Sequence, residues 1–233
     1  WLHCLDIDFR GSVILDDCHA TDRVDFESCR ILGTFSARRA TFDKSLALRR
    51  CQVLALCSDS GRPPAQEQDR WGSREFGGPV AACLDSARIA VDLDLERTTC
   101  HASLRGRRLV VGGNACLSGL RVLPTVVALP SSGAADAVEP EGRLTFAASS
   151  SPALLDLSDS EYGGSVSLNC ALDHAAIVQM KRFAPYCHRP IVDGILRLDG
   201  ARIGGSLWIR GLGVLRLRNT RGGETHVAQF TLR

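Results

Sequence analysis

An eleven-residue period runs through this 233-residue chain and limits the folds it can adopt more than any other feature. When the sequence is divided into blocks of eleven from residue 2, positions one, three, six and eight of the first five blocks are all small or apolar. The other 32 positions between residues 2 and 53 hold only four apolar residues, Leu5, Ile14, Leu32 and Ala47. Such regularity indicates a repeat architecture.

The same frame returns in three later stretches of the chain. The second stretch begins at Ala82, the third at Leu144 and Phe146, and the fourth at Leu196. Glycine pairs follow position eight in the segments VVGG (110–113), EYGG (161–164) and RIGG (202–205). Because glycine adopts positive φ without steric penalty, we expect these pairs to form tight corners with positive φ.

An eleven-residue period also occurs in right-handed coiled coils, so the spacing inside each block must decide between the two folds. Residues two apart share one face of a strand but lie about 200° apart around a helix. The blocks are rich in Val, Ile, Phe, Thr and Cys, with Gly and Asp between them, and this composition favours strands. Each block therefore predicts two short strands joined by a bend.

Two short strands cannot close a coil, whereas four can, so the sequence predicts an all-β, four-sided parallel β-solenoid with about 22 residues per coil. In such a fold the inward residues stack in ladders, and neighbouring coils bond through their backbones at about 4.8 Å. Charge placement supports this period, because Asp17 precedes Arg39 and Glu27 precedes Arg49 by 22 positions. Stacked coils would then set acid over base.

We expect a single β-solenoid domain over residues 1–233, built from repeat blocks with insertions between them. The repeat blocks cover about residues 2–56, 82–133, 144–173 and 191–233, and the insertions cover residues 57–81, 134–143 and 174–190. The chain starts already in frame at Trp1 and Leu2, whereas solenoid ends normally carry a capping segment. The sequence therefore predicts a region of a larger protein.

The insertions are the expected contact regions, because insertions in repeat proteins often gather on a binding face. The first insertion supplies a candidate partner-binding loop with three residues, Arg62, Trp71 and Phe76. In the alternative interpretation, Trp71 and Phe76 fold back to cover a sheet edge. In the third insertion a short helix is expected at residues 175–183, with two candidate helix contacts, Met180 and Phe183.

Ten cysteines suggest redox or metal chemistry, but their positions indicate a structural role. Half of them fall at inward positions of the frame, namely Cys4, Cys18, Cys29, Cys51 and Cys100. A free cysteine packs as a small hydrophobe, and the sequence has neither a CxxC pair nor the spacing of a zinc site. Cys187 and His188, with His174, offer too few ligands for a metal. We therefore expect no metal and no cofactor, and reduced thiols as in a cytoplasmic protein.

Catalytic arrangements are scarce. No GxSxG motif is present. Asp92, Asp94 and Glu96 alternate along the chain as the outward residues of a strand, and Asp94 and Glu96 are the carboxylates that we would substitute to test for glycan activity. Lys and Arg total 28 against 26 Asp and Glu, a balance that does not favour nucleic-acid binding. Corner arginines such as Arg49 and Arg108 are expected to pair with acids of neighbouring coils. No apolar run approaches the roughly 20 residues of a membrane helix.

The inward pairs five residues apart, separated by polar corners, resemble the pentapeptide-repeat solenoids, with one extra residue on every second side. The segment LRLDGARIGGSLWIRG (196–211) is similar to repeats of bacterial proteins labelled "membrane-associated oxidoreductase". The resemblance implies the architecture alone. The gyrase-directed activity of some pentapeptide-repeat proteins is not implied, since the pattern departs from a strict five-residue repeat. The segment LVVGGNACLSG (109–119) lacks the GxGxxG spacing of a dinucleotide site.

These observations predict a non-enzymatic β-solenoid scaffold or protein-interaction module within a larger bacterial protein. Its expected partner is another protein or another domain of the same polypeptide. One alternative is topoisomerase binding by nucleic-acid mimicry, which needs an acidic surface that the net charge of +2 does not favour. A second alternative is a carbohydrate-active β-helix enzyme that uses Asp94 and Glu96. Binding of a small molecule or nucleic acid is not expected.

Overall fold

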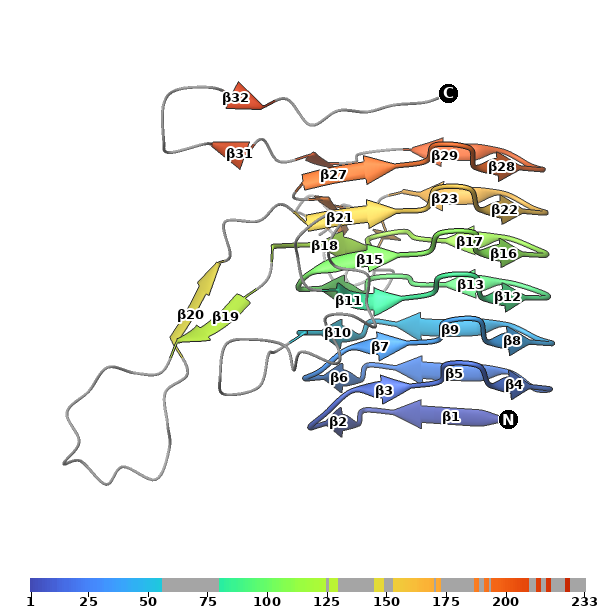
Figure 1. The fold of residues 1–233 in the computed structure, drawn as a ribbon, viewed down its shortest axis with the longest axis horizontal. Coiled ribbons are helices and arrows are strands. Elements are labelled where there is room, and N and C mark those ends of the chain that lie inside the picture. Colours follow the sequence, from blue (N-terminus) through green and yellow to red (C-terminus); the bar gives the residue numbers. More distant parts are fainter. Residues whose placement is uncertain are drawn as a thin grey trace, which may run out of the picture.

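The computed structural model describes residues 1–55, 80–124, 153–169, 191, 192 and 194–209, and the backbone alone of seven short strands outside these ranges. In these residues the chain winds into stacked coils of four short parallel strands (Figure 1). Uninterrupted coils pair with a register of 22 residues, so that Leu2 opposes Val24 and Val24 opposes Leu46. The predicted four-sided parallel β-solenoid is confirmed, and the described residues contain no helix.

Four parallel sheets form the sides of the solenoid, named A to D in the order in which each coil visits them. Sheet A contains β1 (Leu2–Leu5), β5 (Val24–Glu27), β9 (Leu46–Arg49), β13 (Leu93–Asp94), β17 (Ala115–Cys116), β23 (Val166–Leu168) and β29 (Leu207–Ile209). Sheet B contains β2 (Asp8–Phe9), β6 (Arg30–Ile31), β10 (Gln52–Val53), β14 (Thr99–Cys100), β18 (Arg121–Val122), β26 (Ile191–Val192) and β30 (Gly213–Val214).

Sheets C and D complete each coil. Sheet C contains β3 (Val13–Ile14), β7 (Phe35–Ser36), β11 (Val80–Cys83), β15 (Ser103–Arg105), β21 (Ala153–Asp156) and β27 (Gly194–Arg197). Sheet D contains β4 (His19–Ala20), β8 (Thr41–Phe42), β12 (Arg88–Ile89), β16 (Val110–Val111), β22 (Glu161–Tyr162) and β28 (Arg202–Ile203). Coils are numbered 1 to 7 by their sheet A strand, from β1 to β29.

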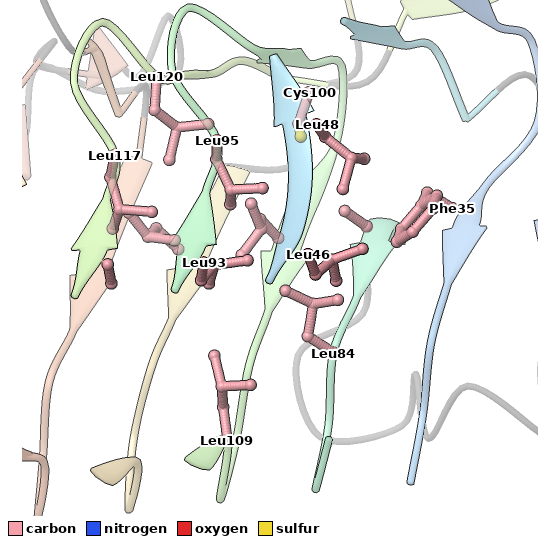
Figure 2. Close-up of a cluster of buried hydrophobic side chains, with 14 of the residues drawn as sticks. Phe35, Leu46, Leu48, Leu84, Leu93, Leu95, Cys100, Leu109, Leu117 and Leu120 are labelled. Carbon is pink, nitrogen blue, oxygen red and sulfur yellow. The ribbon is translucent and has the colours of Figure 1, made fainter. Parts of the chain in front are cut away.

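The core is a narrow column inside the four sheets. Positions one, three, six and eight of the blocks point inward, as predicted, and from coil 2 onward nearly all of them are buried. Leucines from stacked coils converge with Phe35 and Cys100 in this column (Figure 2). Phe26 packs edge-on against Phe35, with ring centroids 5.6 Å apart. Coil 1 has a paired coil on one side only, so it exposes several large apolar residues, among them Trp1, Leu2, Leu5, Ile7 and Ile14.

Position five of the block has a left-handed backbone in every described coil. Non-glycine residues occupy most of these positions, with φ between 53° and 59°: Asp6, Asp17, Ser28, Arg39, Arg50, Ser86, Arg97, Arg108 and Asp159. The backbone N–H of each bonds to the next coil, as Asp17 does to the Arg38 carbonyl at 2.8 Å. A turn with a positive φ at its third residue resembles a type II turn, and it bends the chain between two sheets.

The glycine pairs serve a different purpose from the one expected. None of Gly112, Gly163 and Gly204 has the positive φ that the sequence suggested, because position five supplies that conformation. Instead, each of them lies against the backbone of the coil before it. A Cβ on Gly163 would lie 2.1 Å from the Gly112 carbonyl oxygen, and a Cβ on Gly112 would lie 2.2 Å from the Ala90 oxygen. Glycine is therefore required by the close stacking of the corners.

The boundaries of the interruptions differ from those expected. The solenoid resumes at β11, two residues before the predicted block start at 82. The strands β19 (Val126–Leu129) and β20 (Thr145–Ala148) pair antiparallel with each other. The parallel sheets resume at β21, later than the block start expected at Leu144 and Phe146, and the rest of that block continues them through β22 and β23. The strands β24 (Ala171–Leu172) and β25 (Cys187–His188), and β31 (Leu217–Arg218) and β32 (Thr225–His226), also form antiparallel pairs. Apolar alternation alone does not distinguish such a hairpin from a coil strand.

Candidate functional site

The outward residues of sheet C are tied together by ion pairs between stacked coils. The Asp85 carboxylate accepts hydrogen bonds from the Arg105 guanidinium at 2.6 Å and from the Arg107 backbone N–H at 3.0 Å. The Arg107 side chain also lies 3.3 Å from the carboxylate of Asp156, which is buried. Charges paired in this way compensate one another within the stack and leave little net charge for a ligand.

Sheet A carries a similar network. The buried Asp25 carboxylate receives a hydrogen bond from Arg49 at 2.7 Å and lies 3.2 Å from Arg23. Arg49 also reaches Glu27 at 3.3 Å, which confirms the acid–base stacking predicted from the period of 22. The other predicted pair is formed as well, because Arg39 and Asp17 lie 2.6 Å apart at an exposed corner. These arginines are used within the solenoid.

The carboxylates considered for carbohydrate chemistry, Asp94 and Glu96, follow each other on the outward face of sheet A. Burial raises the pKa of Asp94, and the nearby Glu96 raises it further, while the hydrogen bond from the Glu96 backbone N–H to Asp94 Oδ1 (3.0 Å) opposes both effects. The Glu96 carboxylate lies 3.4 Å from Arg97. Glycosidases place two carboxylates on opposite sides of a sugar ring, whereas Asp94 ends β13 and Glu96 follows it two residues later in the same corner.

The inward cysteines line the core and bond to backbone carbonyls. Cys29 Sγ donates to the Cys4 carbonyl at 3.3 Å, and Cys51 Sγ donates to the Phe26 carbonyl at 3.4 Å, each in the preceding coil. Thr98, which occupies the same position one coil later, donates its hydroxyl to the Leu48 carbonyl. Cys29, Cys51 and Thr98 therefore form a run of small donors at position six of three successive coils, which the sequence analysis treated only as small apolar filler. The run ends at the buried Leu120 of the next coil. The cysteines among the described residues are all free.

These thiols are poor candidates for reactive groups. Burial raises the pKa of Cys51 to about 12 and that of Cys100 to about 12, and the coulombic effect of Cys51 adds to the latter. The thiolate is the reactive form of cysteine, so a thiol with so high a pKa stays protonated and inert near neutral pH. The side chains His174 and Met180 and the remainder of the third insertion lie outside the described residues, as do the side chains of Cys187 and His188.

The outward surface of sheet B differs from those of sheets A and C, where arginines pair with carboxylates of stacked coils. Five residues at position seven define this sheet B face: Asp8, Arg30, Gln52, Thr99 and Arg121. Position nine forms its rim, with Arg10, Leu32, Leu54, His101 and Leu123. The arginines on the face and rim are exposed, and within the described part of the chain they make no ion pair.

The pKa of His101, at the rim of this face, is affected by burial and by the nearby positive charge of Arg121. Burial lowers the pKa of the His101 ring, and the Arg121 guanidinium lowers it further, so the ring is neutral near pH 7. Arg30 opposes Asp8 in the strand register, yet the two side chains form no ion pair. The 22-residue rule alone would have paired Arg30 with Asp8, so the sequence analysis did not single out this face. Arg121 could have indicated an unpaired charge here, because the residue that opposes it in the preceding coil is the uncharged Thr99.

The chain leaves the regular coils at three places up to residue 209, and each adjoins sheet B. Coil 3 is interrupted between β10 and β11, and coil 5 between β18 and β21, in both cases directly after sheet B. Coil 6 is interrupted between β23 and β26, directly before sheet B. In Figure 1 the β19–β20 pair extends away from the stack on the side where β10 and β18 lie. The sheet B face is therefore flanked by all three interruptions.

The candidate contact residues in the insertions cannot be placed on this framework. Arg62, Trp71 and Phe76 lie outside the described residues, and so do Met180 and Phe183 with the helix expected at 175–183. The structure does show where the segments that carry these residues join the coils: the first runs from sheet B to sheet C, and the third runs from sheet A to sheet B. No helix among the described residues is long and apolar enough to cross a membrane.

Comparison with known proteins brings no further assignment. No protein-family model, no curated protein and no solved structure matches this chain.

Proposed function

We propose that this chain is a non-enzymatic β-solenoid scaffold whose inserted segments contact a protein partner. The observation that carries the proposal is the position of the interruptions, which all adjoin sheet B although each coil has four corners. Insertions that gather on one side of a repeat protein are typical of a binding face. The partner is another protein or another domain of the same polypeptide.

A rigid frame is what such a scaffold needs, and the side-chain ladders at the corners supply one. The Asn114 backbone N–H donates to Asp92 at 2.7 Å, and in turn Asn114 Oδ1 accepts from the Ser165 N–H at 2.9 Å. Ser165 Oγ then accepts from the Ser206 N–H at 3.0 Å. Because neighbouring coils lie about 4.8 Å apart, interruptions in coils 3, 5 and 6 are held at a fixed spacing along the axis.

The relationship to pentapeptide-repeat proteins and the cellular location are part of the same proposal. The eleven-residue half-coil is a variant of the pentapeptide-repeat coil, supported by the inward pairs five residues apart on a four-sided frame. A reducing, cytoplasmic location is supported by the free cysteines among the described residues, several of which line the core. The bacterial origin rests on the similarity of segment 196–211 to repeats of bacterial proteins. The paired charges of sheets A and C give no support to a mimic of nucleic acid, which requires an acidic surface.

The proposal is tested by shortening one interruption at a time. In coil 3, residues 54–81 are replaced by the three-residue corner Leu32-Gly33-Thr34 of coil 2, which restores the period of 22. A matched control keeps the length of the segment but replaces residues 56–79 by a Gly/Ser linker. The wild-type protein, the variants and the controls are each immobilised. The proteins that become crosslinked to each of them are identified by mass spectrometry, and the captured sets are compared.

We expect a partner captured by the wild type to be lost both from the shortened variant and from its linker control, while circular dichroism shows the strand content retained. Corresponding replacements are made in coils 5 and 6. A captured protein set that is identical for the wild type and for all the variants would contradict the proposal. Turnover of a small molecule by the purified chain would contradict its non-enzymatic part.

A further inference from the structure

The sheet B face carries positive charge that the solenoid itself does not use. Arg30 and Arg121 are exposed and unpaired within the described part of the chain, and Arg10 extends the same surface at the rim of coil 1. On sheets A and C, by contrast, arginines such as Arg49 and Arg107 lie within 3.3 Å of carboxylates of stacked coils. An unpaired arginine keeps its fork of donors available for an external carboxylate.

The coil spacing fixes how these donors are arranged. Arg30 lies in coil 2 and Arg121 in coil 5, with Gln52 and Thr99 in the two coils between them. At about 4.8 Å per coil the two arginines start about 14 Å apart along the axis. An extended peptide advances about 3.3 Å per residue, so side chains four residues apart on one side are separated by about 13 Å. Gln52 and Thr99 can then hydrogen-bond the peptide groups that lie between the two carboxylates.

The residues around the arginines favour a peptide over nucleic acid. Binding of single-stranded nucleic acid relies on aromatic stacking platforms, and the five face residues and five rim residues include no Phe, Tyr or Trp. Leu32 and Leu123 are half-buried at the rim and offer apolar surface beside the charges.

We propose that the sheet B face binds an acidic, extended segment of a protein partner, laid along the solenoid axis with carboxylates four residues apart on Arg30 and Arg121. The inference deepens the proposed scaffold function and rests on it, since the inserted segments flank the same face. It adds the chemistry of the partner, which the interruptions alone do not specify.

The test is a fluorescence anisotropy titration of the full chain with a labelled eight-residue peptide of alternating Glu and Thr. We expect Arg30→Ala and Arg121→Ala each to weaken binding by up to about 5-fold, and the double variant by up to about 25-fold. Binding should also weaken as salt rises from about 50 to 300 mM. Arg88→Ala is the matched control, because Arg88 is also exposed and has no ion pair with any described residue but lies in sheet D, and it should leave the affinity unchanged.

Several results would overturn this inference. Absence of binding at millimolar peptide would do so, as would a double variant that binds as tightly as the wild type. Equal loss in Arg88→Ala would show unspecific attraction. Tighter, arginine-dependent binding of a single-stranded oligonucleotide of equal length would assign the face to nucleic acid. The titration tests the arginines and the capture experiment tests the insertions, so either proposal can fail alone.

Discussion

The requirement for glycine at the closely stacked corners can be tested by a substitution that adds a single methyl group. In Gly163→Ala the new Cβ would lie 2.1 Å from the Gly112 carbonyl oxygen and 2.9 Å from its carbon. Both atoms belong to the backbone, so no side chain can move aside, and the corner must open by about 1 Å to reach an ordinary contact. The hydrogen bonds from Gly163 N–H to Val111 and from Gly164 N–H to Gly113, both 2.8 Å, would then stretch beyond useful length.

The magnitude follows from these contacts. Overpacking costs about 1–3 kcal/mol, and each lost backbone hydrogen bond adds about 0.5–1.5 kcal/mol, so the free energy of unfolding should fall by about 3 kcal/mol. For a chain of this length the melting temperature should fall by about 6–12 °C. Thermal unfolding followed by circular dichroism measures the shift.

Gly11→Ala is the matched control, because a Cβ at Gly11 meets no atom within 4 Å. This variant should unfold within about 0.5 kcal/mol of the wild type. If Gly163→Ala melted at the same temperature as Gly11→Ala, the close approach of the stacked corners would not constrain the sequence, and the reasoning would be refuted.

Three further predictions concern the turn, the core and the thiols. Ser86 has a positive φ of 59°, so Ser86→Gly should raise the free energy of unfolding in urea by about 0.5–1 kcal/mol. Gly119 has a φ of 70°, so Gly119→Ala should lower it by about 1–2 kcal/mol. The opposite order of stabilities would contradict the turn assignment. Cys51→Thr should change the free energy of unfolding by less than about 1 kcal/mol, since Thr98 holds the equivalent position one coil later. Cys51→Asp buries an unpaired carboxylate and should prevent folding at 37 °C. A folded Asp variant would disprove the inward orientation of this side chain. Because the folded pKa of Cys51 and Cys100 is raised from 9.0 to about 12, their stabilising contribution is complete below pH 9 and is lost as pH rises toward 12, so urea unfolding should show stability declining over that range. At pH 8 iodoacetamide should label both thiols only in urea, and native labelling seen by mass spectrometry would argue against their burial.

Much of the fold follows from the sequence because strand faces alternate locally. Leu46, Leu48, Cys51 and Val53 are two, three and two residues apart, and the structure buries all four. The acid–base stacking of Asp17 with Arg39 also follows, because the coil length sets which residues lie above one another. The hairpin of β19 and β20 was not predicted, since its alternation looks the same as that of a coil strand.

The candidate site was less accessible from the sequence. Arg30 and Asp8 stand 22 residues apart, as Arg39 and Asp17 do, yet only the second pair forms an ion pair. The sequence shows that the chain is interrupted, but the assignment of every interruption to the edges of sheet B requires knowing which strand precedes each break.

The sequence by itself determined the coil length, the number of sides and the inward residues, because these depend on side-chain alternation and on a period that is written along the chain. Only the tertiary structure decided why Gly163 must be glycine, which carbonyls the Cys51 and Thr98 side chains bond to, and which arginines have no ion pair among the described residues. Each of these depends on distances of a few ångströms between atoms of different coils, which no local pattern contains.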